Sequence, residues 1–392
     1  MTENEAPQAH RSLATYSAVG SLTFHYPMKH TLTRWAATAA LILAAPLLLA
    51  ADTFTSGPGW LDFPGGKGPG AGKTIVLLAG DEEYRSEESL PMLARILAER
   101  HGFHAVVLFS HDDGVINPNN GATLGKPEAL DGADALVLGL RFRKWNEATL
   151  AKFDAAVKRG VPIVGTRTST HSFAGIPKES AFAAYNWNAK GGFGKNVLGE
   201  TWISHWGNHK GEATRTAVEP GSEKNPILNG VDIAYGDTDV YEAYPPADAK
   251  VLFRGIVLKD MDPKSPPSER RKKRASDKQE QGVNDPAMAV AWTRELKNDA
   301  GTVNRILCTT MASASDLKDE SLRRLLVNGV FWGLKLDVPA KADVTPLVEW
   351  KPSKYSFNLF HKGLKASDFA GVLPEPEPAA APAPAPKKPA AK

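Results

Sequence analysis

Four short apolar runs, none of which alternates with polar residues, constrain the fold of this chain more than any other feature. They cover residues 74–79, 105–109, 135–139 and 161–164. An apolar run without alternation is typical of a strand in a parallel sheet that is covered on both faces. Helix-length segments follow the first and the third run. The order β-α-β-β-α-β therefore predicts an α/β fold with a doubly wound, mostly parallel sheet flanked by helices.

The segments between these runs carry the start and stop signals of helices. One helix is expected from about Ser89 to His101, because apolar residues recur at helical spacing and Gly102 follows as a C-terminal cap. A second helix is expected after Asn146, whose side chain can cap its N-terminus. Further along the chain we expect three strands and a helix, at residues 250–258, 287–296, 303–310 and 320–334.

The N-terminal part has the composition of an export signal. Residues 28–51 begin with basic residues, continue with a short apolar run and end in small residues, which is typical of a secretory signal peptide. The run is shorter than the roughly 20 residues of a membrane span. We therefore expect an exported protein, periplasmic or extracellular, with no stable membrane span after signal removal. Residues 1–27 would then reflect a mis-assigned start, with translation beginning at Met28 instead of Met1. The alternative to a cleaved signal peptide is an uncleaved N-terminal membrane anchor.

The rest of the chain divides into four parts by composition. We expect a linker rich in Gly and Pro at 52–72, one α/β domain at 73–338, an irregular C-terminal extension at 339–373 and a disordered Pro/Ala/Lys tail at 374–392. Four aromatic residues are expected to anchor the extension on the core: Trp350, Tyr355, Phe357 and Phe360.

Charge and cysteine content exclude several classes of partner and site. The formal net charge is only +3, so the overall charge does not point to nucleic acid. The cationic run at 269–274 is compatible with a polyanion-binding patch, but no aromatic residues interleave it, and we interpret it as a solvated insertion between two strands. The single cysteine, Cys308, excludes an internal disulfide and a multi-cysteine metal site.

Polar loops follow three of the predicted strands, at residues 80–85, 140–145 and 165–171. In open α/β sheets, ligands bind beyond the carboxyl ends of the strands, so we expect these loops to form one site. Salt bridges among their charged side chains are the alternative. The predicted substrate-binding residues in these loops are Asp81, Glu82, Tyr84, Arg143 and Thr168.

The turn after the fourth run resembles the nucleophile elbow of the class I glutamine amidotransferase-like fold. In that fold a cysteine follows the Gly-x pair, whereas this chain has Arg167 after Gly165 and Thr166. An arginine cannot supply the thiolate that glutamine hydrolysis needs. Cys308 lies inside an apolar run and is expected to be a small buried hydrophobe. We therefore expect a related fold without amidotransferase activity.

Five stretches resemble the ThuA-like (trehalose-utilisation) family, and specifically its exported members. They are residues 167–173, 202–209, 238–241, 284–292 and 322–328, which together span the predicted domain. The resemblance implies a glutamine amidotransferase-like, flavodoxin-like fold and a small-molecule ligand derived from a sugar. It also implies that Asp239 and Tyr241 line the substrate pocket.

Three histidines in these stretches allow two chemical interpretations. His205 and His209 are four residues apart, which on a helix puts both on one face, and His171 follows the elbow. Three imidazoles could hold a divalent metal ion, although the sequence requires no cofactor. Alternatively, His171 or His205 is a general acid/base, and Arg143 and Arg167 stabilise a developing negative charge. We predict His171, His205 and Arg167 as the catalytic residues.

The sequence leaves three functions open. The first is an exported protein that acts on, or binds, a sugar or a sugar-derived carbonyl compound. The second is a non-catalytic module that binds a carbohydrate or another partner. The third is a metal-dependent hydrolase that uses the three histidines. The sequence specifies neither the oligomeric state nor whether the chain is an enzyme.

Overall fold

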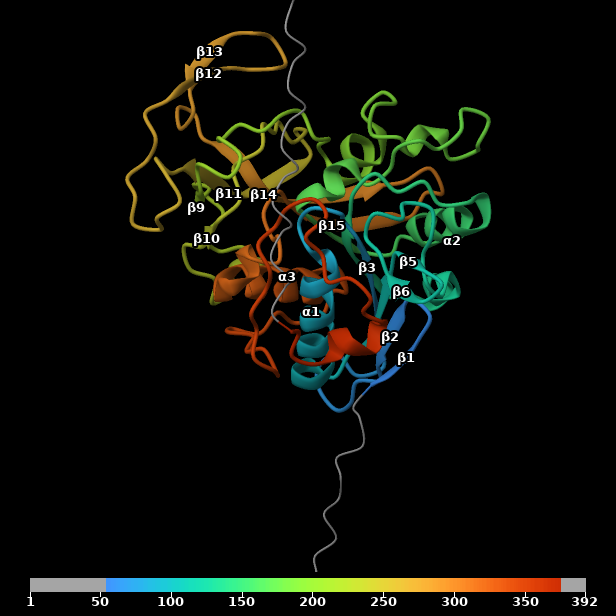
Figure 1. Cartoon of the computed structure of the whole chain (residues 1–392). Helices are drawn as coiled ribbons and strands as arrows, with labels where there is room; N and C mark the ends of the chain where they lie inside the picture. Colours follow the sequence, from blue (N-terminus) through green and yellow to red (C-terminus); the bar gives the residue numbers. More distant parts are fainter. Residues whose placement is uncertain (1–53, 375–392) are drawn as a thin grey trace, which may run out of the picture. The chain divides into compact units, whose positions relative to one another are not determined.

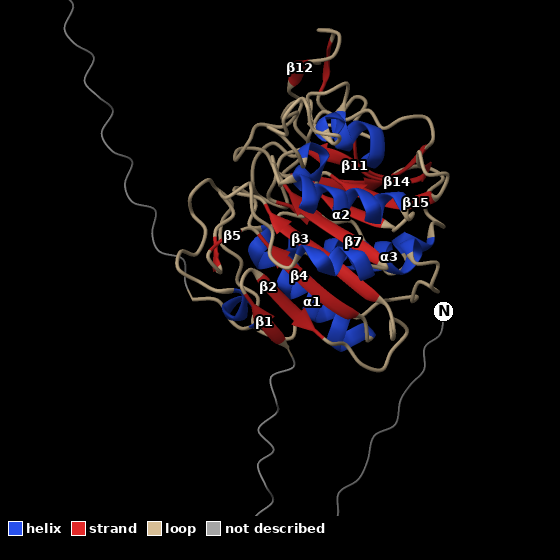
Figure 2. Cartoon of the chain, turned by 90° about the vertical axis from the view of Figure 1, so that its right-hand side faces the viewer, coloured by secondary structure: helices blue, strands red, loops and turns tan. Residues whose placement is uncertain are grey.

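The structure is a computed structural model that describes residues 54–374 (Figure 1). Its main feature is an 11-stranded sheet with the order β1-β2-β4-β3-β7-β8-β15-β14-β11-β9-β10 (Figure 2). The strands are β1 (Thr55–Gly57), β2 (Trp60–Phe63), β3 (Thr74–Gly80), β4 (His104–Phe109), β7 (Ala135–Leu140), β8 (Ile163–Thr166), β9 (Thr214–Val218), β10 (Tyr235–Gly236), β11 (Ala249–Val257), β14 (Met288–Lys297) and β15 (Val303–Thr309). The five central strands, from β4 to β15, run parallel, and the outer strands pair antiparallel.

The prediction of an α/β fold is confirmed, and the four apolar runs form strands β3, β4, β7 and β8. The prediction of a mostly parallel sheet is wrong, because six of the ten pairs of neighbouring strands are antiparallel. Connection length explains part of the difference. Only residues 298–302 connect β14 to β15, whereas a parallel pair needs a crossover of about a dozen residues or more.

Helices cover both faces of the central sheet. The α-helices of residues 54–374 are α1 (Ser86–His101), α2 (Glu147–Lys158) and α3 (Glu320–Gly333). Along β3, Ile75 and Leu77 pack in one cluster with α1 and α3, whereas Val76 and Leu78 pack in a second cluster with α2. All four side chains are fully buried. Because both faces are covered, the run shows no polar alternation.

The segment before β3 belongs to the sheet, which corrects the predicted linker at 52–72. β1 and β2 form a hairpin, and β2 pairs antiparallel with β4. Leu61 and Phe63 of β2 are buried. Two buried positions in a four-residue strand give a weak signal among many glycines and prolines, so composition alone indicated a linker.

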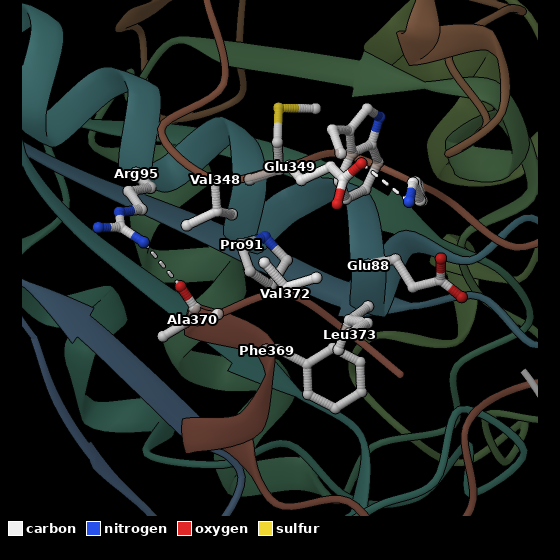
Figure 3. Close-up of a pocket in the computed structure, with 13 residues that line it drawn as sticks. Glu88, Pro91, Arg95, Val348, Glu349, Phe369, Ala370, Val372 and Leu373 are labelled. Carbon is white, nitrogen blue, oxygen red and sulfur yellow. Dashed lines mark hydrogen bonds and ion pairs between the residues drawn. The ribbon is translucent and has the colours of Figure 1, made fainter. Parts of the chain in front are cut away.

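The C-terminal extension has little regular structure and packs against α1. It contains the short 3-10 helix η7 (Ala366–Ala370). Figure 3 shows the extension beside Pro91 and Arg95 of α1, and the Arg95 guanidinium donates a hydrogen bond to the Ala370 carbonyl at 2.9 Å. Among the predicted anchors, Tyr355 is buried, but Phe357 is 47% exposed, so the anchoring role of Phe357 is wrong.

The cationic insertion forms a small hairpin that stands apart from the main sheet (upper left in Figure 1). Its strands, β12 (Arg271–Lys273) and β13 (Glu280–Gly282), pair antiparallel. The predicted start region, signal peptide and tail lie outside the described residues, apart from Pro374. Within residues 54–374, no helix is both long and apolar enough to span a membrane.

Candidate functional site

The structure brings the three predicted loops together at one edge of the sheet. Strands β3, β7 and β8 are parallel neighbours, so the loops that follow them lie side by side. The Thr168 hydroxyl donates a hydrogen bond to the Asp81 carboxylate, which joins the first loop to the third. Arg143 binds the Glu82 carboxylate at 2.9 Å, which joins the first loop to the second. The loops are therefore joined into one cluster of polar groups.

Arg167, at the elbow position, is buried and bound by protein groups. Its φ of 38° lies in the left-handed region, which residues other than glycine rarely adopt. The guanidinium lies between the rings of Tyr84 and Tyr241, 4.7 and 3.8 Å from their centroids, and both tyrosines are 2% exposed. It also donates a hydrogen bond to Asp239 Oδ1 at 2.9 Å. Arg167 is therefore a fixed positive charge inside the site, held by a backbone conformation that is common at functional sites.

Asp239 is the centre of the hydrogen-bond network. Its Oδ1 accepts hydrogen bonds from Arg167 at 2.9 Å and from His209 Nδ1 at 3.1 Å, and its Oδ2 accepts one from His205 Nδ1 at 2.8 Å. The carboxylate is buried. Burial alone would raise its pKa, but the charge of Arg167 and the hydrogen bonds from the histidines outweigh burial and hold the pKa of Asp239 below its usual range. Asp239 is therefore an anion that orients both imidazoles.

The two histidines are carried by a loop and do not share a helix face. Residues 201–212 contain no helix. Two consecutive amides of this segment donate hydrogen bonds to the Val240 carbonyl at 2.8 and 3.0 Å, which turns the chain around the buried carboxylate. The ring centroids of His205 and His209 are 4.5 Å apart. The two rings are neighbours because of this turn and not because of helical spacing.

His209 lies between two carboxylates. Its Nδ1 is 3.1 Å from Asp239 Oδ1, and its Nε2 is 3.1 Å from Glu83 Oε1. These hydrogen bonds raise the pKa of His209 to about 9, although partial burial opposes them. An imidazolium donates with both nitrogens. His209 is therefore a cation at neutral pH, with no lone pair available to accept a proton.

His205 has one ring nitrogen without a protein partner. Its Nδ1 is bound to Asp239, whereas its Nε2 has no hydrogen-bond partner among residues 54–374. The side chain is 35% exposed. A carboxylate on Nδ1 favours the tautomer that carries its proton there, which leaves a lone pair on Nε2. This arrangement suits a general base.

His171 lies outside this network, in a wall of aromatic rings. Its Nδ1 is 3.1 Å from the Thr170 hydroxyl, and its ring centroid is 5.0 Å from Phe142 and 5.6 Å from Trp202. Burial, together with the charge of Arg141, holds the pKa of His171 well below its usual range. His171 is therefore neutral and a weak base, which argues against its predicted role as the acid/base group.

The residues that could hold a metal ion are His205, His209 and Asp239, whose ligand atoms lie within 4.8 Å of one another. The third candidate ligand is therefore Asp239, whereas the sequence analysis named His171. Two imidazoles and a carboxylate suit a zinc-like ion. The fit is poor, because Asp239 already binds the guanidinium of Arg167 at 2.9 Å, and this buried positive charge opposes a divalent cation.

Three of the predicted substrate-binding residues use their polar atoms inside the protein. Asp81 accepts hydrogen bonds from the amides of Glu83 and Tyr84, at 2.8 and 2.9 Å, and from the hydroxyl of Thr168. Arg143 donates to several main-chain and side-chain oxygens. Asp81, Thr168 and Arg143 are each no more than 2% exposed. These side chains shape the loops and have little surface left for a ligand.

An open hollow of about 580 Å³ lies against Phe142, whose ring is a neighbour of His171. Residues that line it include Glu82, Asn119, Phe142, Lys144 and Trp187. The Trp187 ring centroid lies 5.8 Å from Phe142 and 6.0 Å from Trp202. The Trp202 ring lies 5.8 Å from His205. Neighbouring rings therefore lead from the hollow to the candidate base.

Arg141 is a residue of the site that the sequence analysis missed. Its side chain is 17% exposed, compared with 2% for Arg143. It binds Glu82, and its guanidinium carbon lies 4.5 Å from the Phe142 ring centroid. The sequence favoured Arg143 from the same loop. Phe142, at a φ of 52°, turns the chain between the two arginines. The sequence around Phe142 does not predict this turn.

Two further contributors, Glu83 and Tyr355, were not among the predicted site residues. Glu83 holds His209, although the sequence indicated it only as a salt-bridge partner. Tyr355 of the C-terminal extension stacks on Tyr84, with ring centroids 5.0 Å apart. Tyr355 carried an aromatic signal, but nothing in the sequence says against which loop it packs.

The environment of Cys308 argues against thiol chemistry. Cys308 is fully buried in β15, where it lies opposite Gly165 of β8. Burial raises the pKa of its thiol. The chain therefore offers no exposed thiolate for glutamine hydrolysis among residues 54–374.

No protein-family model matches this chain, and no curated protein matches it. Among solved structures, the chain is similar to a protein of Parabacteroides merdae that is provisionally described as ThuA-like, with 12% identity over 73% of this chain and 97% of that chain and a TM-score of 0.41. It is also similar to a protein of Bacteroides uniformis with the same description, with 13% identity over 71% and 98% of the two chains and a TM-score of 0.42. A third similar structure is the exo-β-1,4-mannosidase Op5Man5 of an Opitutaceae bacterium, with 10% identity over 66% of this chain and 34% of that chain and a TM-score of 0.26. The solved structures that this chain is similar to thus include two described as ThuA-like, the family that its sequence motifs resemble.

Proposed function

We propose that this chain is an exported ThuA-like enzyme that acts on a sugar or a sugar-derived carbonyl compound by acid–base catalysis. One observation carries the proposal: Asp239 holds His205 Nδ1 at 2.8 Å, while Nε2 has no partner among residues 54–374. A general base needs a fixed ring and an available lone pair. The signal-like composition of residues 28–51 supports export.

The arrangement of the central strands supports an amidotransferase-like, doubly wound fold. Across the sheet, strands β4, β3, β7, β8 and β15 stand in the order 2-1-3-4-5 of their appearance among the parallel strands. Flavodoxin-like sheets share this order, and their ligands bind beyond the carboxyl ends of the strands. The loops of the site follow those ends.

The residues of the site divide the chemistry between them. His205 Nε2 accepts a proton from the substrate next to its carbonyl group, and the buried anion of Asp239 stabilises the resulting imidazolium. Arg141 is partly exposed and lies over the ring of Phe142, which lines the hollow, so its positive charge can stabilise negative charge on the carbonyl oxygen. Arg167 and His209 keep Asp239 in place and do not touch the substrate.

The hollow offers groups that a sugar-like ligand can use. Phe142 and Trp187 are half-buried and offer ring faces, on which the C–H groups of a sugar ring can pack. Asn119 offers an amide for hydroxyl groups. Glu82 is paired with Arg141 and Arg143, and Lys144 adds an exposed positive charge to the lining.

Turnover by the full-length chain tests the proposal. Disaccharides and their oxidised keto forms are incubated with the chain, and products are followed by chromatography. His205→Ala should lower kcat by at least roughly 100-fold, since general bases contribute about 10²–10⁴-fold. His104→Ala is the matched control, because His104 also binds an aspartate, Asp62, at 2.8 Å, but lies at the opposite end of the parallel strands.

The outcomes separate the three functions. Equal turnover in wild type and His205→Ala would refute the proposed base. Saturable binding of a sugar without any product would favour the binding module. We expect a chelator to leave turnover unchanged; loss of turnover that added zinc restores would favour the metal-dependent hydrolase.

A further inference from the structure

We propose that the cationic hairpin, residues 269–282, positions His205 and His209, and that Arg270 and Lys272 are the residues through which it acts. The role in turnover rests on the proposed function, whereas the role in holding the two rings does not. The sequence indicated only a solvated insertion or a polyanion patch. The contacts of the run assign it a different role.

Exposure alternates along the cationic run. Arg270 and Lys272 are half-buried, whereas Glu269, Arg271 and Lys273 are exposed. Successive side chains of a strand point to opposite faces. One face of the hairpin therefore lies on the protein, and the other lies in solvent. A solvated insertion accounts only for the outer face.

Lys272 binds the main chain of the candidate base itself. Its ammonium group donates a hydrogen bond to the His205 carbonyl. It also lies 5.8 Å from the ring centroid of Trp206, the next residue along the loop. Because a charged donor forms a strong hydrogen bond with a carbonyl, Lys272 restrains the peptide group that carries the imidazole.

Arg270 restrains the residues between the two histidines. Its guanidinium donates a hydrogen bond to the Trp206 carbonyl at 2.9 Å and binds the Glu212 carboxylate at 2.6 Å. Glu212 in turn accepts a hydrogen bond from the Asn208 amide at 2.7 Å. The hairpin thus binds positions 205, 206 and 208 of residues 201–212, which we call the histidine loop. It does so directly or through the carboxylate of Glu212.

The opposite side of the loop is held by the segment that carries Asp239. The amides of Trp206 and Gly207 donate to the Val240 carbonyl. Glu242 of the same segment accepts a hydrogen bond from the Ala275 amide at 3.0 Å, which fixes the hairpin to that segment. The histidine loop is therefore held between the cationic hairpin and the segment that carries Asp239, and these two are bound to each other. Small displacements of reacting groups lower rates strongly, so this clamp matters for catalysis.

The alternation of the run supplies matched controls for a test. Arg270→Met and Lys272→Met each remove an inward charge, and Arg271→Met and Lys273→Met each remove an outward one. The inward variants should lower kcat at least 10-fold, leave KM within about twofold and shift the imidazole NMR signals of His205 and His209 in the full-length chain. The outward variants should match wild type in all three. Lys272→Arg, which keeps a donor, should restore the kcat and the signals.

The NMR signals need no substrate, so they separate this proposal from the proposed function. If no compound is turned over but the inward variants still shift the two imidazole signals, the clamp holds and the proposed function fails. If inward and outward variants leave the signals equally unchanged, the positioning role is wrong. Failure of Lys272→Arg to restore the signals would also overturn it.

Discussion

Arg167 occupies the position at which an elbow of this kind places its nucleophile, and it changes what the elbow can do. A buried guanidinium needs an anion beside it, and Asp239 supplies one at 2.9 Å. The same carboxylate binds Nδ1 of His205, which leaves Nε2 available. An arginine at this turn cannot act as a thiolate nucleophile, and through Asp239 it helps to orient the imidazole of His205.

Asp239→Asn should destabilise the fold strongly, because it leaves the Arg167 guanidinium buried without its counter-ion. Breaking a buried pair in this way lowers the free energy of unfolding by about 3–5 kcal/mol. Urea titration of the full-length chain measures the change. The control is Glu219→Gln, which breaks the Arg254–Glu219 pair at the surface and should lower it by less than about 1 kcal/mol. Equal changes in the two variants would contradict the assigned role of Asp239.

The stability that His209 contributes should depend on pH. Its pKa in the folded protein is about 9, above the usual value of 6.5. A raised pKa means that the contribution is fully present below pH 6.5 and is lost as the pH rises through about 9. The difference in unfolding free energy between wild type and His209→Gln, measured by urea titration, should therefore be largest at pH 6 and smallest at pH 10. A difference that does not change with pH would show that His209 is not held as a cation.

The sequence showed the kinds of residue at the site better than their partners. Of the residues that it predicted for the site, His205, Arg167 and Asp239 join one hydrogen-bond network. The sequence analysis assigned His171 a chemical role because a histidine that follows such a turn is a candidate acid/base group. Its burial among aromatic rings, which lowers its pKa, could not be predicted from the sequence. The hydrogen-bond partner of a side chain depends on how loops that are distant in the sequence approach one another. A local sequence pattern does not predict this.

At the scale of elements, buried strands and helices were predictable, whereas the loops between them were not. Strand β3 and helix α1 are set by the spacing of apolar residues, and the structure confirms both. Strands β1 and β2 were missed because they are short and lie among glycines and prolines. The four-residue spacing of His205 and His209 left a shared helix face open, because this spacing has the same appearance in a helix and in a turn.

Gly207→Ala should disturb the histidine loop more than it disturbs the fold. An added Cβ at this position would lie 3.0 Å from Asp239 Cβ and 3.3 Å from the Val240 amide nitrogen, so the loop must move away from the carboxylate. We expect kcat to fall at least 10-fold, with a loss of stability of about 1–3 kcal/mol. Turnover and urea titration measure the two effects.

Gly211→Ala is the control for this substitution. Its Cβ would lie 3.6 Å from the Asn208 Cβ, which is an ordinary contact. Neither glycine has φ in the left-handed region, so backbone strain does not separate the two variants. If Gly211→Ala lowers kcat as much as Gly207→Ala does, close approach to Asp239 is not what the loop requires.

At the scale of the whole molecule, the site joins segments from distant parts of the chain. The loop after β3 supplies Tyr84, the segment before β11 supplies Asp239, and the C-terminal extension supplies Tyr355. The Tyr355 hydroxyl donates a hydrogen bond to the Asp237 carbonyl at 3.0 Å. The extension therefore contributes to the site as well as covering α1. The sequence analysis expected it to pack on the core through anchors that include Tyr355, but did not connect it to this site.

Because these segments meet only in the folded chain, a ligand that bridges them should stabilise the whole molecule. A ligand at about 100 times its dissociation constant adds roughly 2.7 kcal/mol to the stability of the folded state. This corresponds to a rise of several degrees in Tm. We expect a neutral sugar or keto-sugar to produce this rise in a thermal-shift screen. Trp187→Ala should reduce the rise, because Trp187 lines the hollow. Trp60→Ala, on strand β2, should preserve it, because Trp60 does not line the hollow. An equal rise in the two variants would place the ligand outside the hollow.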